Sequence, residues 1–272
     1  MADIYNVEVH GIILDTSLIK EYDKRLMILT AELGRITVFA NGARRKNSML
    51  TAVSQKFVMG TFTLRPSRDT YTLISANVTE RFEELTRDID ALAYASYACE
   101  VAGYFVEDGV GAKDELNLLY VTFKAIILGR LNLELIRAIF MCKLLDVEGE
   151  RLEMSRCVKS GVTTDLKYLS ISEGGLLTGS VYRSMRDSIA MNPHLTDDAR
   201  RGELEYFDTF NFTVSQDAIY TLRYIFSRKL AETYSFSVSD ALLSELKQIA
   251  SAYLKKHADR HFKSLDILKP LV

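Results

Sequence analysis

"RLMILTAELGRITVFANGARRKNS", residues 25–48, holds two short apolar runs separated by a turn and ends in three consecutive cations and a serine. The second run alternates, with Ile36, Val38 and Ala40 on one face and Arg35, Thr37, Phe39 and Asn41 on the other. Alternation with a period of two is the pattern of a half-buried strand. Gly34 in the intervening turn can adopt the positive φ that a hairpin turn needs. The stretch therefore predicts a β-hairpin that leads into a cationic loop.

Three more apolar runs flank this hairpin. They are NVEVHGIIL (residues 6–14), KFVMGTFTLRPS (residues 56–67) and TYTLISANVTE (residues 70–80). The last two are joined by a turn-like PSRD sequence, and Gly60 indicates a bulge or a bend in its strand. Five short strands within the first 80 residues best fit the five-stranded OB-fold barrel, with a short helix near residues 48–54.

Beyond residue 80 the spacing of apolar residues becomes helical. Two later helices are predicted to begin at capping-box spacings, Thr213 with Gln216 and Ser237 with Asp240. Residues 150–181, between the two groups of helices, contain glycines and show only a weak pattern. We therefore predict an α+β protein. Its domains would be an OB-fold nucleic-acid-binding domain at residues 1–80 and an α-helical domain at residues 81–272, with an irregular insert at residues 150–181.

The composition is that of an ordinary globular chain, with 272 residues, of which 48% are hydrophobic and 26% charged. The longest apolar runs are far shorter than the roughly 20 residues that cross a bilayer, and no signal peptide is expected at the N-terminus. Cys99, Cys142 and Cys157 show no pairing pattern, which is typical of free thiols in a reducing compartment. We therefore expect a cytoplasmic protein.

No catalytic motif is evident in the sequence. "GVGAK" (residues 109–113) lacks the Gly-Lys-Ser/Thr ending of a phosphate loop. His257 and His261 are four residues apart, but no third ligand stands in register, so a surface pair is favoured over a metal site. The sequence predicts a protein that is not an enzyme and has no cofactor.

Charge is distributed unevenly, although the formal net charge is only −2. Residues 20–56 contain eight Lys/Arg against three Asp/Glu, a local net charge of +5, and such a field attracts polyanions. The candidate nucleic-acid-binding residues are Lys20, Lys24, Arg25, Arg35, Phe39, Arg44, Arg45, Lys46, Ser48 and Lys56. The cations and Ser48 would contact phosphates. Phe39 would either stack on a base or pack against the helical domain, and a merely solvated loop remains the alternative.

The longer stretch GIILDTSLIKEYDKRLMILTAELGRITVFANGARRKNSML, residues 11–50, resembles the N-terminal domain of the RecO family of bacterial recombination mediators. The matching positions are Glu21, Asp23, Leu29, Thr30, Gly34, Ala40, Gly42, Arg44 and Ser48. A weaker resemblance extends over the whole chain. It implies a protein of the RecFOR pathway of recombinational DNA repair that binds single- and double-stranded DNA and anneals complementary strands. It also implies partners: RecR, the C-terminal tail of single-strand-binding protein and, indirectly, RecA, which is loaded onto coated strands.

The insert departs from this family pattern. Many RecO proteins carry a four-cysteine zinc module there, whereas here Cys157 stands at the first ligand position and Ser160, Thr178 and Val181 stand at the other three. A structural zinc needs four nitrogen or sulfur ligands. The sequence therefore predicts a zinc-finger-like insert that has lost its ligands and holds no metal. The residues expected to hold it by packing are Tyr168, Leu176 and Leu177.

Two other classes of function fit the same sequence. The first is a protein–protein adaptor whose helical domain offers an apolar groove with a cationic rim to an acidic peptide. The candidate rim residues are Arg223, Arg228, Lys229, Lys255, Lys256 and Arg260. The second is an RNA-binding OB-fold protein, which suits the barrel but not the long helical domain.

Overall fold

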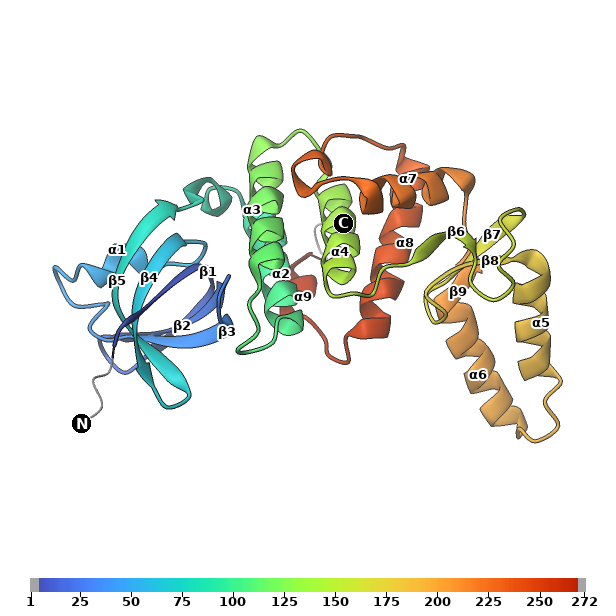
Figure 1. Ribbon diagram of the computed structural model, residues 1–272, viewed down its shortest axis with the longest axis horizontal. Coiled ribbons are helices and arrows are strands. Elements are labelled where there is room, and N and C mark those ends of the chain that lie inside the picture. Colours follow the sequence, from blue (N-terminus) through green and yellow to red (C-terminus); the bar gives the residue numbers. More distant parts are fainter. Residues whose placement is uncertain (1–4, 269–272) are drawn as a thin grey trace. The chain divides into compact units, whose positions relative to one another are not determined.

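The computed structural model describes residues 5–268, and its first part is a closed five-stranded barrel with strand order β1-β2-β3-β5-β4 (Figure 1). The elements are β1 (Val7–Ile19), β2 (Asp23–Thr30), β3 (Gly34–Ala40), α1 (Leu50–Val53), β4 (Met59–Ser67) and β5 (Thr70–Glu80). All neighbouring pairs are antiparallel except β3 and β5, which are parallel. The predicted OB-fold barrel and its short helix are confirmed.

The interior of the barrel is filled by the apolar side chains that alternate along its strands. The inward side chains that are almost fully buried include Val9, Ile13, Leu26, Ile28, Val38, Phe62, Leu64 and Leu73. Burying these apolar groups removes them from water, which is the main force that closes a small barrel. Of the bulge or bend predicted at Gly60, the structure shows a bulge-like irregularity, since the β4–β5 register shifts between Met59 and Gly60. A Cβ at Gly60 would lie only 2.2 Å from the Asn77 carbonyl oxygen, so the close strand contact requires glycine.

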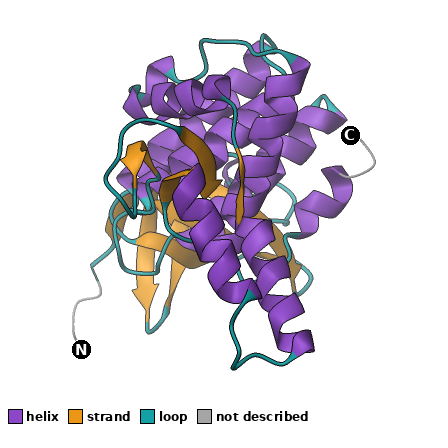
Figure 2. Ribbon diagram, turned by 90° about the vertical axis from the view of Figure 1, so that its right-hand side faces the viewer, coloured by secondary structure: helices purple, strands orange, loops and turns teal. Residues whose placement is uncertain are grey.

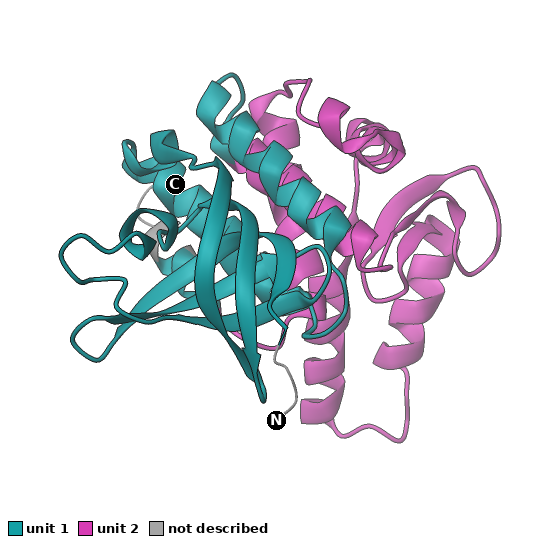
Figure 3. Cartoon of the chain, turned by 60° about the vertical axis from the view of Figure 1, so that its left-hand side comes forward, with its two compact units in different colours: residues 1–133, 262–272 teal, residues 134–261 magenta. Residues whose placement is uncertain are grey.

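The chain forms two compact units (Figure 3), and unit 1 joins the barrel to three helices and a 3-10 turn. These elements are η1 (Glu83–Thr86), α2 (Ile89–Phe105), α3 (Lys113–Leu128) and α9 (Lys263–Leu268). Phe123 of α3 packs edge-on against Phe57 and Phe82, with ring centroids 5.3 and 5.2 Å apart. Asp88 caps α2 by accepting a hydrogen bond from the Ala91 N–H at 2.7 Å.

Unit 2, residues 134–261, combines helices with a four-stranded sheet of order β6-β8-β7-β9 (Figure 2). Its elements are α4 (Leu133–Val147), β6 (Glu153–Cys157), β7 (Leu166–Ser170), β8 (Gly175–Thr178), α5 (Gly179–Ala190), α6 (Asp197–Phe210), β9 (Asn211–Thr213), α7 (Gln216–Ser227), η2 (Leu230–Glu232) and α8 (Asp240–His257). Most side chains of helix α4 are buried, so this helix contributes much of the core of unit 2.

The sheet corrects the prediction of an irregular insert at residues 150–181. Three of its four strands lie in that segment. They are only four or five residues long, and all four residues of β8 are buried, so the sequence shows no alternation there. A strand that is buried on both faces has no polar side to reveal its period.

The predicted capping residues of the two late helices were each two positions too early. Ser215 caps α7, because its hydroxyl accepts a hydrogen bond from the Ala218 N–H at 3.0 Å. Ser239 caps α8 in the same way. Thr213 instead lies in β9, where it pairs with Tyr168 of β7.

The boundary between the two compact units lies at residues 133–134, whereas the predicted domain boundary lies at residue 80, where the strands end and the helices begin. That domain boundary stays a prediction. Within residues 5–268, no helix is long and apolar enough to cross a membrane.

Candidate nucleic-acid interface

The strand register brings three loops to one end of the barrel. The β1–β2 turn lies at the start of β2, where Lys24 pairs with Ala40 at the end of β3. Next to it, Phe39 of β3 pairs with Thr72 near the start of β5. The β4–β5 turn connects to that same start. The segment after β3, with its three consecutive cations, therefore lies beside the β1–β2 and β4–β5 turns.

Hydrogen bonds connect the β1–β2 turn to the loop after β3. The Gly42 N–H donates to the Asp23 carboxylate at 2.7 Å, and the Arg44 N–H donates to the Tyr22 carbonyl at 3.0 Å. The Arg44 guanidinium also donates to the Glu21 carbonyl at 2.9 Å. Gly42 has a φ of +68°, which glycine adopts without steric cost. These contacts hold the cationic loop in place against the β1–β2 turn.

Five predicted cations are exposed at this end, and we call them the barrel rim: Lys20, Arg25, Arg44, Arg45 and Lys46. The Arg45 guanidinium lies over the Tyr22 ring, 5.7 Å from its centroid. Within the described residues, none of the five forms an ion pair with a carboxylate. Their charges are therefore available to an anionic ligand. A group of arginine and lysine side chains whose backbone is held in place by hydrogen bonds is suited to binding phosphate groups.

Three other predicted cations make contacts inside unit 1. Lys24 is buried, its ammonium donates to the Ser54 carbonyl at 2.9 Å, and burial, aided by Arg44, lowers the pKa of Lys24. Arg35 forms an ion pair with Asp108 at 3.0 Å and also donates to the Gly103 carbonyl. Lys56 donates to the Ser96 hydroxyl at 3.0 Å. The structure does not bring these three side chains to the barrel rim.

Ser48 and Phe39 differ in their surroundings. The Ser48 hydroxyl accepts a hydrogen bond from the Leu50 N–H at 3.3 Å at the start of α1. Phe39 is half-buried on the outer face of β3, opposite Arg25 of β2. Sequence reasoning missed two exposed cations nearby, Arg65 near the end of β4 and Arg68 in the β4–β5 turn. The signal was present, because that turn is one of the loops through which OB-fold barrels bind ligands.

The four positions of the family's zinc module lie close together in unit 2. Burial raises the pKa of the Cys157 thiol, but hydrogen bonds from the Ser160 side chain and from backbone N–H groups outweigh it and bring the pKa to about 7. The Thr178 hydroxyl accepts from the Val181 N–H at 3.4 Å and caps α5. Tyr168 stacks on Tyr182 with ring centroids 3.9 Å apart. Within residues 5–268, no cluster of three or more His, Cys, Asp or Glu side chains is placed to hold a metal ion.

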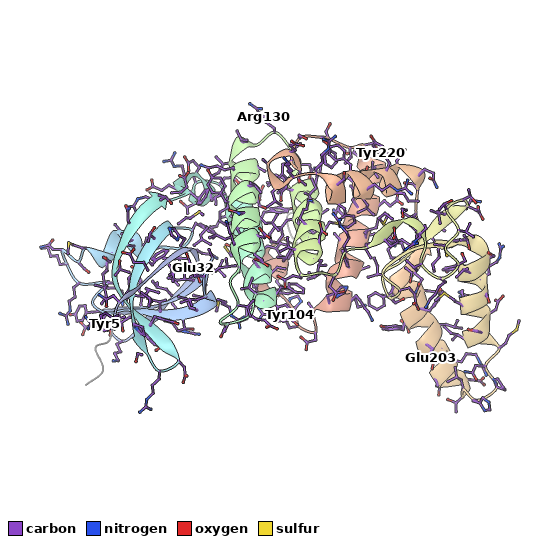
Figure 4. All side chains as sticks on the ribbon, in the orientation of Figure 1. Tyr5, Glu32, Tyr104, Arg130, Glu203 and Tyr220 are labelled. Carbon is purple, nitrogen blue, oxygen red and sulfur yellow. The ribbon has the colours of Figure 1, made fainter. Side chains whose placement is uncertain are left out.

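The candidate partner-binding residues of unit 2 form separate groups. Arg228 lies over the Tyr224 ring at 4.7 Å from its centroid, and Tyr224 lines a mainly apolar pocket of about 380 Å³. Tyr220, labelled in Figure 4, lines the same pocket and is exposed. Lys229 is the next residue after Arg228 and is also exposed.

The remaining partner-binding candidates lie elsewhere in unit 2. Arg223 donates to the Met154 carbonyl at 2.7 Å, beside a different, smaller pocket. Lys255 and Lys256 lie near the aromatic ring of Phe210, and Arg260 is exposed beyond the end of α8. Arg228 and Lys229 therefore combine exposed positive charge with the larger of these two pockets, although Arg228 also pairs with Glu232 at 3.4 Å.

A closed OB-fold barrel with a cationic rim, continued by helices, defines a protein of the OB-barrel class with a helical second part. Comparison with known families agrees over nearly the whole chain. The profile described as "Recombination protein O N terminal" matches residues 1–82, and "Recombination protein O C terminal" matches residues 86–266. The chain belongs to the RecO family, and its role lies in recombinational DNA repair.

Individual relatives support this assignment. The DNA repair protein RecO of Acetivibrio thermocellus is 28% identical over 270 residues, which cover 97% of each chain. That of Alkaliphilus metalliredigens is 27% identical over 267 residues, covering 97% of this chain and 99% of the relative. That of Caldicellulosiruptor bescii is 32% identical over 171 residues, or 62% of this chain and 70% of the relative.

Proposed function

We propose that this chain is a DNA-binding recombination mediator that holds DNA at the barrel rim. The observation that supports this most strongly is the set of five exposed cations, without acidic partners among the described residues. They lie on strand β2 and on two loops that hydrogen bonds hold together. Contacts to phosphates carry no base information. Binding at the rim therefore suits a protein that must act on any sequence, in single- or double-stranded form.

Annealing follows from the same chemistry. Two complementary strands repel each other through their phosphates, and cations that neutralise phosphates on both strands reduce that repulsion. The rim would hold one strand while leaving its bases free to pair. This step makes and breaks no covalent bond, so it requires neither a catalytic residue nor a cofactor.

The test is a titration of the full-length protein with labelled 20-nucleotide single-stranded DNA, its 20-base-pair duplex and RNA of the same sequence, followed by an annealing assay. We expect binding to both DNA forms and faster annealing than without protein. Absence of DNA binding at low salt would refute the proposal. Binding to RNA alone would favour the RNA-binding alternative.

The partner roles are a further part of the proposal. We assign the acidic C-terminal tail of single-strand-binding protein to the pocket lined by Tyr220 and Tyr224. Arg228, which also pairs with Glu232, lies over the Tyr224 ring of this apolar pocket, and Lys229 adds a second exposed cation next to it in the chain. Cooperation with RecR, loading of RecA and a cytoplasmic, nucleoid-associated location are proposed from family membership.

A labelled acidic tail peptide tests this pocket. Arg228→Ala should weaken its binding, while Lys255→Ala, which removes an exposed cation from helix α8, should leave it unchanged. Equal loss in both variants would instead indicate nonspecific charge attraction. A chain that binds the peptide but not DNA would favour the adaptor function.

A further inference from the structure

Four residues form a continuous row across the outer face of the barrel. Arg25 of β2 pairs with Phe39 of β3, Phe39 pairs with Thr72 of β5, and Thr72 pairs with Arg65 of β4. Cross-strand partners point to the same side of a sheet. Their chain neighbours Leu26, Val38, Leu73 and Leu64 are almost fully buried. The row itself must therefore face outward, since successive side chains alternate between the two faces.

The row places an aromatic ring between two arginines. Neighbouring strands lie about 4.8 Å apart, so Arg25 lies one strand from Phe39 and Arg65 two strands away on the other side. Arg25 and Arg65 are exposed, and Phe39 is half-buried. Within the described residues, neither arginine forms an ion pair with a carboxylate. An aromatic ring flanked by unpaired cations is the arrangement with which proteins hold single-stranded nucleic acid.

The helices of unit 1 contact β3 elsewhere. Arg35 lies four residues before Phe39, about 13 Å along the strand, and it is Arg35 that contacts Gly103 and Asp108. Phe39 instead lies near the end of β3, next to the loop that carries Arg44, Arg45 and Lys46. This location favours base stacking over the alternative that Phe39 packs against the helical domain.

We propose that this row is a single-strand platform. One unpaired base stacks on the Phe39 ring, Arg25 and Arg65 contact the phosphates on either side, and Arg68 in the adjoining turn extends the path. The inference rests on the proposed function, since it requires that the rim binds DNA. The two parts of the surface then have different roles. Arg44, Arg45 and Lys46 bind phosphates of either DNA form, whereas Phe39 sets the preference for single strands.

The preference follows from what each form exposes. In a duplex the base faces are covered by neighbouring bases, so a ring on a sheet surface cannot stack on them. In a single strand a base can turn out and stack. Loss of one base stacked on an aromatic ring weakens binding by about 5-fold to about 140-fold, and the duplex should show no such loss.

The experiment measures dissociation constants for a 20-nucleotide oligothymidine and a 20-base-pair duplex by fluorescence anisotropy. We expect Phe39→Leu, which keeps an apolar side chain on the strand, to weaken single-strand binding by at least about 5-fold and duplex binding by less than about 2-fold. Phe39→Trp should retain single-strand affinity. Ile74→Ala removes another exposed apolar side chain from the barrel and should change neither constant.

Arg65 is tested through salt dependence. Arg65→Ala should lower the single-strand salt slope by about 0.7, the value for one phosphate contact. Arg130→Ala, an exposed arginine after α3 in the same unit (Figure 4), should leave the slope unchanged.

Two results would overturn the platform. One is unchanged single-strand affinity in Phe39→Leu, and the other is an equal loss for both DNA forms. If variants of Arg44, Arg45 and Lys46 still lose binding in the same assay, the proposed function stands and only the platform fails. If the wild type binds no DNA, the proposed function itself fails.

Discussion

Replacing Arg44, Arg45 and Lys46 together by alanine tests how the barrel rim binds phosphates. All three side chains are exposed, and none forms an ion pair with a carboxylate in the part of the chain that the structure describes. Each can therefore neutralise about one phosphate. Each phosphate contact contributes about 0.9 to the salt slope for duplex DNA and about 0.7 for single strands. The triple variant should lower these slopes by about 2.7 and about 2.1.

The change is large enough to measure. When the salt concentration rises fourfold, the affinity of the wild type for duplex DNA should fall about 40-fold more than that of the variant. This factor is about four raised to the power of the slope difference, about 2.7. Stability should change little. The Arg44 guanidinium loses one exposed hydrogen bond to the Glu21 carbonyl, and a hydrogen bond contributes about 1 kcal/mol.

Fluorescence anisotropy at four or more salt concentrations gives both slopes. The matched control is the triple variant Lys255→Ala, Lys256→Ala and Arg260→Ala, which removes the same charge from unit 2. We expect its slopes to equal those of the wild type. Parallel lines for wild type and rim variant would refute the assignment of these three cations to phosphates.

Three further outcomes are expected. Arg35→Ala should lower the free energy of unfolding in urea by about 1–2 kcal/mol, because Arg35 contacts Asp108 and the Gly103 carbonyl, while an altered DNA salt slope would place Arg35 in the interface. The Cys157 thiol has a pKa of about 7 in the folded chain against about 9 unfolded, so its stabilising effect is full above pH 9 and lost as the pH falls through 7; the free energy of unfolding of the wild type, measured in urea, should therefore fall by about 2 kcal/mol more than that of Cys157→Ser between pH 9 and pH 6. Equal pH profiles of the two proteins would argue against a thiolate in the folded state. Elemental analysis of the purified protein should find no stoichiometric zinc, because Ser160, Thr178 and Val181 replace three ligands, and one zinc per chain would contradict the lost module.

The barrel was predictable because its signals are local. Ile36, Val38 and Ala40 alternate with more polar neighbours, and all three proved to be buried on one face of β3. The same reasoning, applied to β2, could have identified Lys24. It lies in phase with Leu26 and Ile28, which point into the barrel. A lysine on the core side of a strand is a poor candidate for binding a ligand at the surface.

Other features depend on contacts that are distant in sequence. Arg35 lies on the outer face, as predicted, but its partner Asp108 is 73 residues away. No local pattern connects the two. The sheet of unit 2 was missed for a related reason, because β8 pairs in parallel with β6 and antiparallel with β7. Its order depends on pairing between segments. Strands β6, β7 and β8 are only four or five residues long, and β8 is buried on both faces, so they show little alternation.

The candidate site was predictable in part. The cationic loop was evident from composition, and the exposure of Arg44, Arg45 and Lys46 agrees with it. The alignment of Phe39 with Arg25 and Arg65 was not evident, since Arg65 lies 26 positions beyond Phe39 in the chain. The parallel pairing of β3 with β5 is needed to connect the two hairpins that carry these residues into one row.

The central claim is that DNA binds at the end of the barrel where the β1–β2 turn, the loop after β3 and the β4–β5 turn meet. The most direct measurement is hydrogen exchange of the full-length protein with and without a 20-nucleotide single strand. We predict that binding slows exchange at residues 20–25, 37–48 and 64–72 and leaves helix α4 unchanged. Slower exchange confined to unit 2, with none at these barrel segments, would contradict the account.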